Sequence, residues 1–313
     1  MPEEIATRVA YGEALLELGR RNPKVVALDA DLSGSTKTSL FAREFPQRFF
    51  NLGVAEQNLM GVAAGLALAG FIPFASTFAI FATGRAWEVI RQSIAYSAAN
   101  VKIVASHGGI TVGPDGGSHQ ALEDLALMRT LPNMVVIVPA DAVEMRGAVE
   151  AVAEVEGPCY VRGGRIKFPL IHPPDYRFRV GKGVCLREGS DVTLAACGLM
   201  VHQALAAARE LAAEGISAEV LNLATVKPLD QELVAASAAK TGCVVTCEEH
   251  LVSGGLGGAV AEVLAESCPV PLERIGVRDT FGISGTPQEL LAYFGLTPGD
   301  IKSAARRVME RRG

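Results

Sequence analysis

The chain has 313 residues, of which 49% are hydrophobic and 20% charged, and its formal net charge is −5. This composition is typical of a packed globular protein and argues against disorder, and the length suits two domains of ordinary size. Because there is no basic excess, nucleic acid and anionic membrane surfaces are poor candidate partners, and any anion must be met by a local cluster of cations. The six cysteines form no CxxC pair and the N terminus does not resemble a secretory leader, so we expect a cytoplasmic protein with structural thiols.

The first half of the chain alternates between helical and extended patterns. It opens with a predicted helix over residues 6–21, and further helices are predicted near 38–45, from Glu56 onward and over 86–98. The predicted strands cover residues 24–30, 48–53, 70–76, 101–106, 134–140 and 158–164. This order predicts an α/β fold whose sheet is mostly parallel and flanked by helices.

One long stretch of the first half carries no charge, from Asn58 to Gly84, and Glu56 stands at its head. Its length exceeds the roughly 20 apolar residues that span a bilayer. Glycines, Pro73 and several polar residues interrupt the stretch, however, and residues 70–76 look like a strand that follows a helix. We therefore predict a buried helix, a strand and the start of a second helix, and no membrane span.

Between Gly163 and Gly189 the composition shifts to prolines and mixed charge without a helical period. This pattern predicts a linker or hairpin between domains, and we place the domains at 1–165 and 189–313 with the linker at 166–188. The second half repeats the alternation of strands and helices, with an alanine-rich helix that includes residues 204–213. Its predicted strands cover residues 191–198, 217–223, 243–250 and 272–277.

The densest group of polar residues is the glycine-rich loop "SHGGITVGPDGGSHQALED", which contains His107, Asp115 and His119. It follows a predicted strand, and ligands of parallel α/β sheets collect at the carboxyl ends of strands. The alternative is a flexible turn with solvated histidines. A zinc site is disfavoured because no cysteine lies close and the spacing matches no usual zinc pattern, so we expect no metal ligand on this chain.

Other candidate residues have plain structural alternatives. Asp31 and Ser35 follow a predicted strand in "LDADLSGS", where a helix cap or turn would also explain them. Arg8 precedes the first helix and, by its position alone, is a solvated arginine. Phe78 and Phe81 share one helical face, which by itself indicates core packing.

Two further motifs raise the question of anion binding. Arg162 and Arg165 follow a predicted strand, where they are either surface charges or an anion clamp. The glycines of "SGGLGG" at 253–258 lack the G-x-G-x-x-G order of a dinucleotide loop, so we interpret them as a tight turn.

Taken in order, several motifs resemble the C-terminal half of transketolase, a thiamine diphosphate enzyme. They are "IATR", "LDADLSGS", "GVAEQNL", "STFAIF", "HGGITVGPDGGSHQ", "LPNMVVIVPA" and "GPCYVRGGR". The resemblance covers the whole chain and implies a pyrimidine-binding domain followed by a transketolase C-terminal domain. It is shared with 1-deoxyxylulose-5-phosphate synthase and with the β subunits of 2-oxoacid dehydrogenase E1 components.

The resemblance also shows what this sequence lacks. In the family, the diphosphate and its Mg²⁺ (or Ca²⁺) are held by a domain whose motif begins with G-D-G, and no G-D-G occurs in this chain. The resemblance therefore implies one half of a split transketolase, with an N-terminal partner subunit that holds the diphosphate and the metal ion. Two copies of each chain are implied, an α2β2 assembly with a homodimer contact through this chain.

By resemblance, Glu56 is the catalytic residue that hydrogen-bonds the N1′ atom of the cofactor's aminopyrimidine ring. Burial disfavours the charged form of a carboxyl group, so we expect the apolar run behind Glu56 to favour proton sharing. Phe81 is implied to stack on the ring beside Phe78, and Asp31 to lie near the thiazolium ring. Gly84 stands where the family often has a further aromatic residue, so the pocket is expected to be wider or filled by another side chain.

The resemblance also implies a sugar-phosphate site. His119 would lie near the C1 hydroxyl of the donor and Asp115 near a secondary hydroxyl, while His107 would lie toward the phosphorylated end and, with His119, take part in catalysis. The phosphate would be held by a further set of side chains, namely Arg8, Ser35 and Arg165, with Arg162 as the alternative arginine.

A histidine at position 107 favours transketolase, since deoxyxylulose-phosphate synthases usually carry an acid there. The implied reaction moves a two-carbon ketol unit from a ketose phosphate to an aldose phosphate in pentose phosphate metabolism. The alternatives are half of another thiamine diphosphate enzyme, or a non-catalytic interaction subunit.

Overall fold

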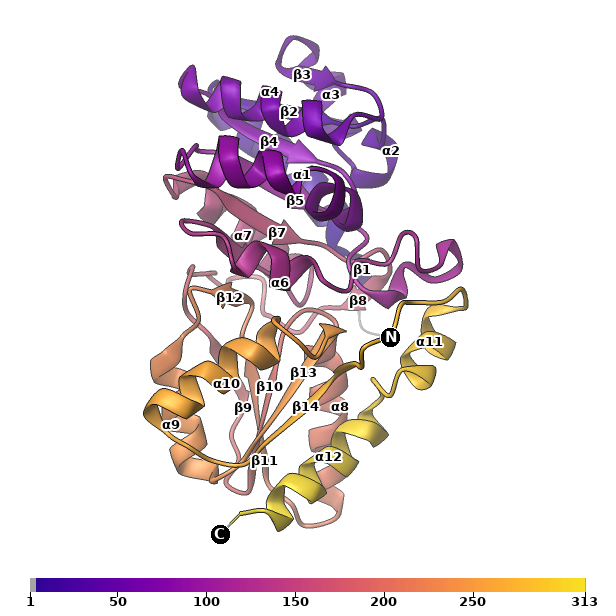
Figure 1. Cartoon of the computed structure of the whole chain (residues 1–313), viewed down its shortest axis with the longest axis vertical. Helices are drawn as coiled ribbons and strands as arrows, with labels where there is room; N and C mark the ends of the chain where they lie inside the picture. The colour runs from indigo at the N-terminus through magenta and orange to yellow at the C-terminus, as the bar shows by residue number, and fades with distance from the viewer. Residues whose placement is uncertain (1–3, 313) are drawn as a thin grey trace.

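The computed structural model describes residues 4–312, and Figure 1 shows two α/β units, one above the other along the longest axis. The first unit contains the N-terminal half of the chain and the second contains the C-terminal half. This confirms the prediction of two α/β domains.

Within the described residues, the first unit has a seven-stranded sheet. Its spatial order is β12 (Thr225–Lys227), β6 (Val135–Ile137), β7 (Cys159–Arg162), β5 (Lys102–Ala105), β4 (Ile72–Ser76), β2 (Val25–Asp29) and β3 (Phe49–Asn51). All neighbouring pairs are parallel except β12 with β6. The inner strands β2 and β5 are buried along their whole length, as expected for a parallel sheet that is covered on both faces.

Helices cover this sheet and bring the candidate residues to its carboxyl edge. Helix α1 (Thr7–Arg21) packs on α7 (Ala142–Glu154), and α4 (Glu56–Leu68) packs on β4. The shorter elements are α2 (Ser33–Thr36), α3 (Ser39–Glu44), η1 (Pro46–Arg48), η2 (Phe81–Arg85), α5 (Trp87–Val89), η3 (Ile90–Ala95), η4 (Ile110–Asp115) and α6 (Asp124–Arg129).

The second unit has a five-stranded sheet in the described part of the chain. Its order is β14 (Leu272–Val277), β13 (Val244–Leu251), β10 (Val192–Ala196), β11 (Ala218–Asn222) and β9 (Val184–Arg187), of which only β9 pairs antiparallel. Its helices are α8 (Met200–Ala213), α9 (Gln231–Thr241), α10 (Leu256–Ser267), α11 (Pro287–Tyr293) and α12 (Pro298–Glu310).

The expected linker at 166–188 contains two strands, one attached to each unit. Strand β8 (Lys167–Pro169) pairs with β1 (Glu4–Ala6) beside the start of the first unit, whereas β9 joins the second sheet. The domain limits at residues 165 and 189 remain a prediction, but the segment between them is structured at both ends.

The uncharged stretch 58–84 is divided among α4, β4 and the start of η2, as predicted. Within residues 4–312, no helix has both the length and the apolar character needed to cross a membrane. The single helix expected over 86–98 is wrong in detail, because η2 and η3 are π-helical and only α5 between them is α-helical. The Thr83 hydroxyl donates a hydrogen bond to the Ala79 carbonyl oxygen (2.8 Å), a contact that often bends helices, and π segments are frequent at functional sites.

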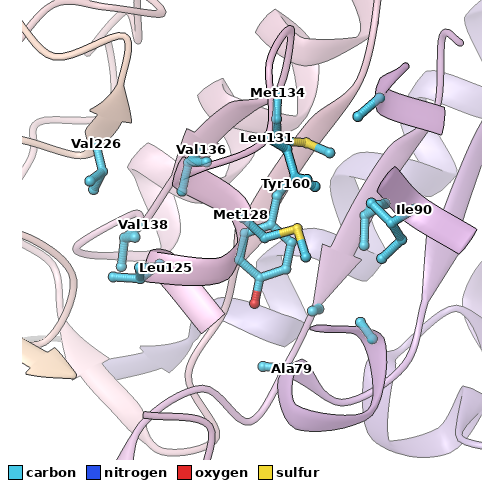
Figure 2. Packing of buried hydrophobic residues seen from close by; sticks show 14 of the residues in the cluster. Ala79, Ile90, Leu125, Met128, Leu131, Met134, Val136, Val138, Tyr160 and Val226 are labelled. Carbon is cyan, nitrogen blue, oxygen red and sulfur yellow. The ribbon is translucent and has the colours of Figure 1, made fainter. Parts of the chain in front are cut away.

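Strand β12 belongs by sequence to the second half but completes the first sheet. Its Val226 joins a buried cluster with Val136 and Val138, which Figure 2 shows together with Leu125 of α6. The same cluster continues into the second sheet through residues such as Leu221. The hydrophobic core therefore runs through both units.

Candidate active site

The candidate residues gather at the carboxyl ends of three neighbouring parallel strands. Asp31 follows β2, Phe78 follows β4 and His107 follows β5. Phe78 and Ser106 form an isolated parallel bridge that carries the pairing of β4 and β5 beyond the strands themselves. Because parallel strands end at one edge of a sheet, side chains from separate parts of the sequence meet here.

Glu56 is the first residue of α4, and its side chain is only 4% exposed. Its Oε1 atom lies 3.1 Å from Nη1 of Arg85, which comes from the end of η2. Together with Ala55, Gln57 and Asn58, these two side chains line a shallow hollow of about 510 Å³.

The surroundings of Glu56 therefore differ from those predicted. The sequence suggested only an apolar wall behind the carboxylate, whereas the structure places Glu56 in the first turn of α4 and 3.1 Å from the guanidinium of Arg85. The pattern missed Arg85 because its distance from Glu56 along the chain gives no sign of contact. The only available signal was that Arg85 is the first charge after the uncharged run.

Four aromatic rings form a chain beside this carboxylate. Phe78 and Phe81 stack with centroids 5.8 Å apart, Phe78 stacks on His107 at 3.8 Å, and Phe81 meets the edge of His119 at 5.2 Å. Phe78 is 7% exposed and belongs to the buried side, whereas Phe81 is half-buried and keeps part of its ring accessible. Of the two rings, Phe81 is thus the one that could stack on a ligand.

His107 is held in a neutral form at the centre of the site. It lies in the left-handed region (φ 61°), is 3% exposed, and its Nδ1 atom is 2.8 Å from the Ser106 hydroxyl. Burial, followed by the charges of Arg8 and Arg165, lowers the pKa of His107 from 6.5 to about 3. The ring can therefore exchange hydrogen bonds with a ligand without carrying a charge at neutral pH.

Two guanidinium groups converge near His107. Arg8 donates to the Ser35 carbonyl oxygen (3.0 Å), and Arg165 lies 3.4 Å from the Asp115 carboxylate and donates to the Val112 carbonyl oxygen. Burial, and then the nearby charge of Arg165, lowers the pKa of Arg8. Arg8 and Arg165 repel each other, and the half-exposed Asp115 carboxylate lies beside Arg165. Such a pair of cations favours the binding of an anion.

The structure does not bring Arg162 into this cluster. Its side chain is 4% exposed, its Nε atom is 3.0 Å from Asp124, and its Nη2 atom donates to the carbonyl oxygens of Ala121 and Glu249 (both 2.9 Å). A Cβ atom at Gly108 would lie 2.1 Å from the Nε atom of Arg162, so glycine lets the loop pass directly over the arginine. Arg162 therefore connects the two units beneath the site.

Asp31 and His119 lie at the exposed rim of the site. Asp31 has a left-handed backbone (φ 62°) and exchanges hydrogen bonds with the Asn51 side chain, which also comes from a strand end. His119 is half-buried, with its Nδ1 atom 2.9 Å from the Ser118 hydroxyl. Asn51 was not singled out from the sequence, because its position at the end of β3 is not distinctive until the strand order is known.

The glycine-rich turn at 253–258 lies apart from this site and is structural. The Glu248 carboxylate accepts hydrogen bonds from the backbone N–H groups of Leu256 and Gly257 (2.7 and 2.8 Å) at the start of α10. A protein carboxylate thus occupies the donors that a nucleotide phosphate would need. This confirms the interpretation of the segment as a tight turn.

The residues present suit an aminopyrimidine ring. A carboxylate that lines an open hollow can accept or share a proton with a ring nitrogen. Phe81 offers an aromatic face nearby, since Arg85 contacts both Glu56 and the Phe81 ring. Asp31 would lie on the rim of the same edge.

Comparison with known families identifies both units. The pyrimidine-binding domain of transketolase matches residues 3–169, and the C-terminal domain of transketolase matches residues 181–301. The chain belongs to the transketolase family.

Similar proteins include separate transketolase chains of the same length. A protein of Methanocaldococcus jannaschii that is described as a transketolase C-terminal section is 52% identical over 97% of this chain and 95% of its own. A 6-deoxy-6-sulfo-D-fructose transketolase subunit of a Clostridium species is 47% identical over 99% and 96%. A solved structure described as a split gene transketolase, inactive beta4 tetramer, is 58% identical, covers 99% of this chain and 100% of its own, and has a TM-score of 0.93. These findings confirm the fold and the resemblance to the C-terminal section of transketolase, a family that uses thiamine diphosphate.

Proposed function

We propose that this chain is the catalytic C-terminal subunit of a split transketolase. The observation that carries the proposal is the meeting of Glu56, Phe81, the two histidines and a pair of arginines at one edge of the sheet. The reaction would transfer a two-carbon ketol unit from a ketose phosphate to an aldose phosphate, as in pentose phosphate metabolism. The retention of these side chains argues against a non-catalytic interaction subunit.

Thiamine diphosphate, when bound, supplies a carbon nucleophile and a place to store the electrons of the broken C–C bond. Glu56 would hold the ring nitrogen N1′ and share its proton, and Phe81 would fix the plane of the ring. His107, in its neutral form, would bind a sugar hydroxyl, as would His119, and Asp115 would accept from a further hydroxyl. Hydrogen bonds of this kind, once a bound ligand covers them, reject substrates that lack the matching hydroxyl.

Arg8, Arg165 and Ser35 would hold the sugar phosphate. The convergence of Arg8 and Arg165, close enough for one charge to lower the pKa of the other, supports this assignment. Arg162 is a poor candidate because Asp124 already pairs with it beneath the loop.

The partner would be an N-terminal transketolase subunit that binds the diphosphate through Mg²⁺ or Ca²⁺, in a cytoplasmic α2β2 assembly with this chain at a homodimer contact. The description of two similar proteins as a transketolase C-terminal section and a transketolase subunit supports the need for such a partner. The description of the solved relative as an inactive beta4 tetramer is consistent with a chain of this type being insufficient alone.

The test is to purify the chain with a protein that carries the G-D-G motif, and to add thiamine diphosphate, Mg²⁺, xylulose 5-phosphate and ribose 5-phosphate. We expect two-carbon transfer by the mixture and none by either chain alone. Cleavage of pyruvate without ketol transfer would instead indicate half of a 2-oxoacid dehydrogenase E1 or deoxyxylulose-phosphate synthase. A 6-deoxy-6-sulfo-D-fructose donor in the same assay tests whether the preference resembles that of the Clostridium relative.

A further inference from the structure

Arg85 contacts both groups that the proposed function assigns to the pyrimidine ring. Its Nη1 atom lies 3.1 Å from Oε1 of Glu56, and the centre of its guanidinium lies 4.2 Å from the centroid of the Phe81 ring. A planar cation thus pairs with the carboxylate and covers an aromatic face at the same time. An aminopyrimidine would need the same carboxylate and an aromatic face.

The exposures of the two charged side chains differ widely. The Glu56 side chain is 4% exposed, whereas that of Arg85 is 54% exposed. The carboxylate is fixed at the first turn of α4, whereas the guanidinium is already partly hydrated and can turn further into water. Of the two, Arg85 is therefore the side chain that can leave.

The backbone around Arg85 allows this motion to stay local. The Gln57 side chain donates to the Arg85 carbonyl oxygen (3.1 Å) and so ties the end of η2 to α4. The preceding residue, Gly84, has no side chain, and a Cβ atom placed there would meet only the Cδ1 atom of Ile80 at 4.0 Å. The space at Gly84 is therefore open, and the Arg85 side chain, which is 54% exposed, can rotate toward water.

We propose that Arg85 is a positioning residue that holds the place of the aminopyrimidine in the free chain and swings toward solvent when the ring binds. This inference rests on the proposed function. Two consequences follow from the geometry. The ring must compete with an internal cation, which lowers the apparent affinity by the fraction of molecules in which Arg85 covers the site. Once Arg85 has left, the Oε1 atom of Glu56 is free to form a hydrogen bond with the ring.

The test compares ring binding in Arg85→Met with that in the unaltered chain. Methionine keeps an apolar chain against Phe81 but removes the charge, and Arg85→Gln serves as a second variant in case methionine disturbs folding. Arg43→Met is the matched control, since Arg43 is an exposed arginine of α3, away from this edge. The probe is 4-amino-5-hydroxymethyl-2-methylpyrimidine, the neutral ring portion, added to the full chain.

Binding can be followed through Trp87, the only tryptophan in the sequence, two residues beyond Arg85. Its indole N–H donates to the Leu127 carbonyl oxygen (3.2 Å), so the ring is fixed close to Arg85 and its emission should respond when the Arg85 side chain moves. We expect Arg85→Met to bind the probe about 2- to 5-fold more tightly than the unaltered chain and Arg43→Met, the size expected when a partly exposed ion pair is lost. NMR titration of the probe provides a second measurement of the same constant.

Equal or weaker binding by both Arg85 variants, or binding by none of the proteins, would overturn the inference. Repeating the titration with thiamine diphosphate and the partner chain separates this role from anion binding. If Arg85 bound the diphosphate, its replacement would weaken the binding of thiamine diphosphate. The two-carbon transfer assay reports separately on the proposed function. If two-carbon transfer is observed but the Arg85 variants do not bind the probe more tightly, the proposed function stands and the role of Arg85 falls. If the variants bind the probe more tightly but no two-carbon transfer is observed, the ring site serves another reaction.

Discussion

His107 illustrates how the fold sets the chemistry of a single side chain. On the sequence it is one of two histidines in a glycine-rich loop, and an exposed histidine would titrate near pH 6.5. In the structure it is buried on the ring of Phe78 and faces Arg8 and Arg165, so it stays neutral far below that pH. The residue type could be predicted as part of a site, but its charge state depends on neighbours that are distant in the sequence.

This neutral histidine should make the protein sensitive to acid. The unfolded chain takes up a proton at His107 as the pH falls through 6.5, whereas the folded chain does so only near pH 3. The contribution of His107 to stability is therefore complete above pH 6.5 and is lost progressively between pH 6.5 and 3. Asparagine tolerates the left-handed backbone of His107. Between pH 7 and pH 5, we expect His107→Asn to lose about 2 kcal/mol less stability than the unaltered chain, measured by urea unfolding. Equal losses in the two proteins would contradict this explanation.

Arg165 should act on the substrate and not on the fold. Its side chain is 34% exposed and its carboxylate partner, Asp115, is 33% exposed, so the pair adds little stability. In the enzyme assembled with its partner, Arg165→Met should raise KM for a phosphorylated ketose roughly 10- to 100-fold, the range expected for a lost charge-assisted hydrogen bond. KM for an unphosphorylated ketose is the control. An equal rise for both ketoses would remove Arg165 from the phosphate site.

At the scale of elements, the sequence predicted most of the regular structure. Buried strands such as β2 and β10 are mostly apolar, and α8 has a strong helical composition, so local patterns were sufficient. Strand β12 was missed because it has only three residues and pairs with β6 about ninety positions earlier in the chain. The π-helical turns of η2 were missed for a similar reason, since they depend on hydrogen bonds and packing that composition does not reveal.

The different roles of Arg162 and Arg165 also depend on contacts between segments that are distant in the sequence. The two residues are three positions apart and look equivalent in the sequence, but Arg162 ends β7 with its side chain beneath the loop, whereas Arg165 lies beyond the strand. Only the position of Asp124 in the neighbouring α6 shows which arginine is held in a buried ion pair.

The buried pair of Arg162 and Asp124 should be important for stability. The two side chains are 4% and 0% exposed and 3.0 Å apart, and removal of one partner would leave the other charge buried and unpaired. We expect Arg162→Met to lower the free energy of unfolding by about 3–5 kcal/mol. Arg165→Met, three residues away, is the control and should change it by less than about 1 kcal/mol. Similar effects of the two substitutions would show that Arg162 does not hold the units together.

At the scale of the whole molecule, the two units are joined by a continuous hydrophobic core. The cluster in Figure 2 includes Val138 of the first unit and Val226 of β12, and further members lie on the second sheet. Interfaces between the domains of one chain are commonly more polar than the interfaces of obligate complexes, and they permit the domains to move relative to each other. A shared core instead favours a single rigid body that presents the site from one face.

A single unfolding transition is therefore expected. Since β12 and the core cluster connect the units, loss of one should expose the apolar surface of the other. In urea, tyrosine and tryptophan fluorescence and far-UV circular dichroism should give the same midpoint within error. Two separated transitions would show that the units unfold independently and that β12 is not a structural bridge.

The central claim, that Glu56 performs the proton chemistry of a split transketolase, is tested most directly by Glu56→Gln in the assembled enzyme. Glutamine keeps the shape and burial of the side chain but cannot share a proton with the ring nitrogen. In the presence of the partner subunit, thiamine diphosphate and Mg²⁺, the variant should remain folded and assembled, with two-carbon transfer reduced at least about 100-fold. Near-normal transfer by the folded variant would contradict the assignment of Glu56 and, with it, the mechanism proposed for this chain.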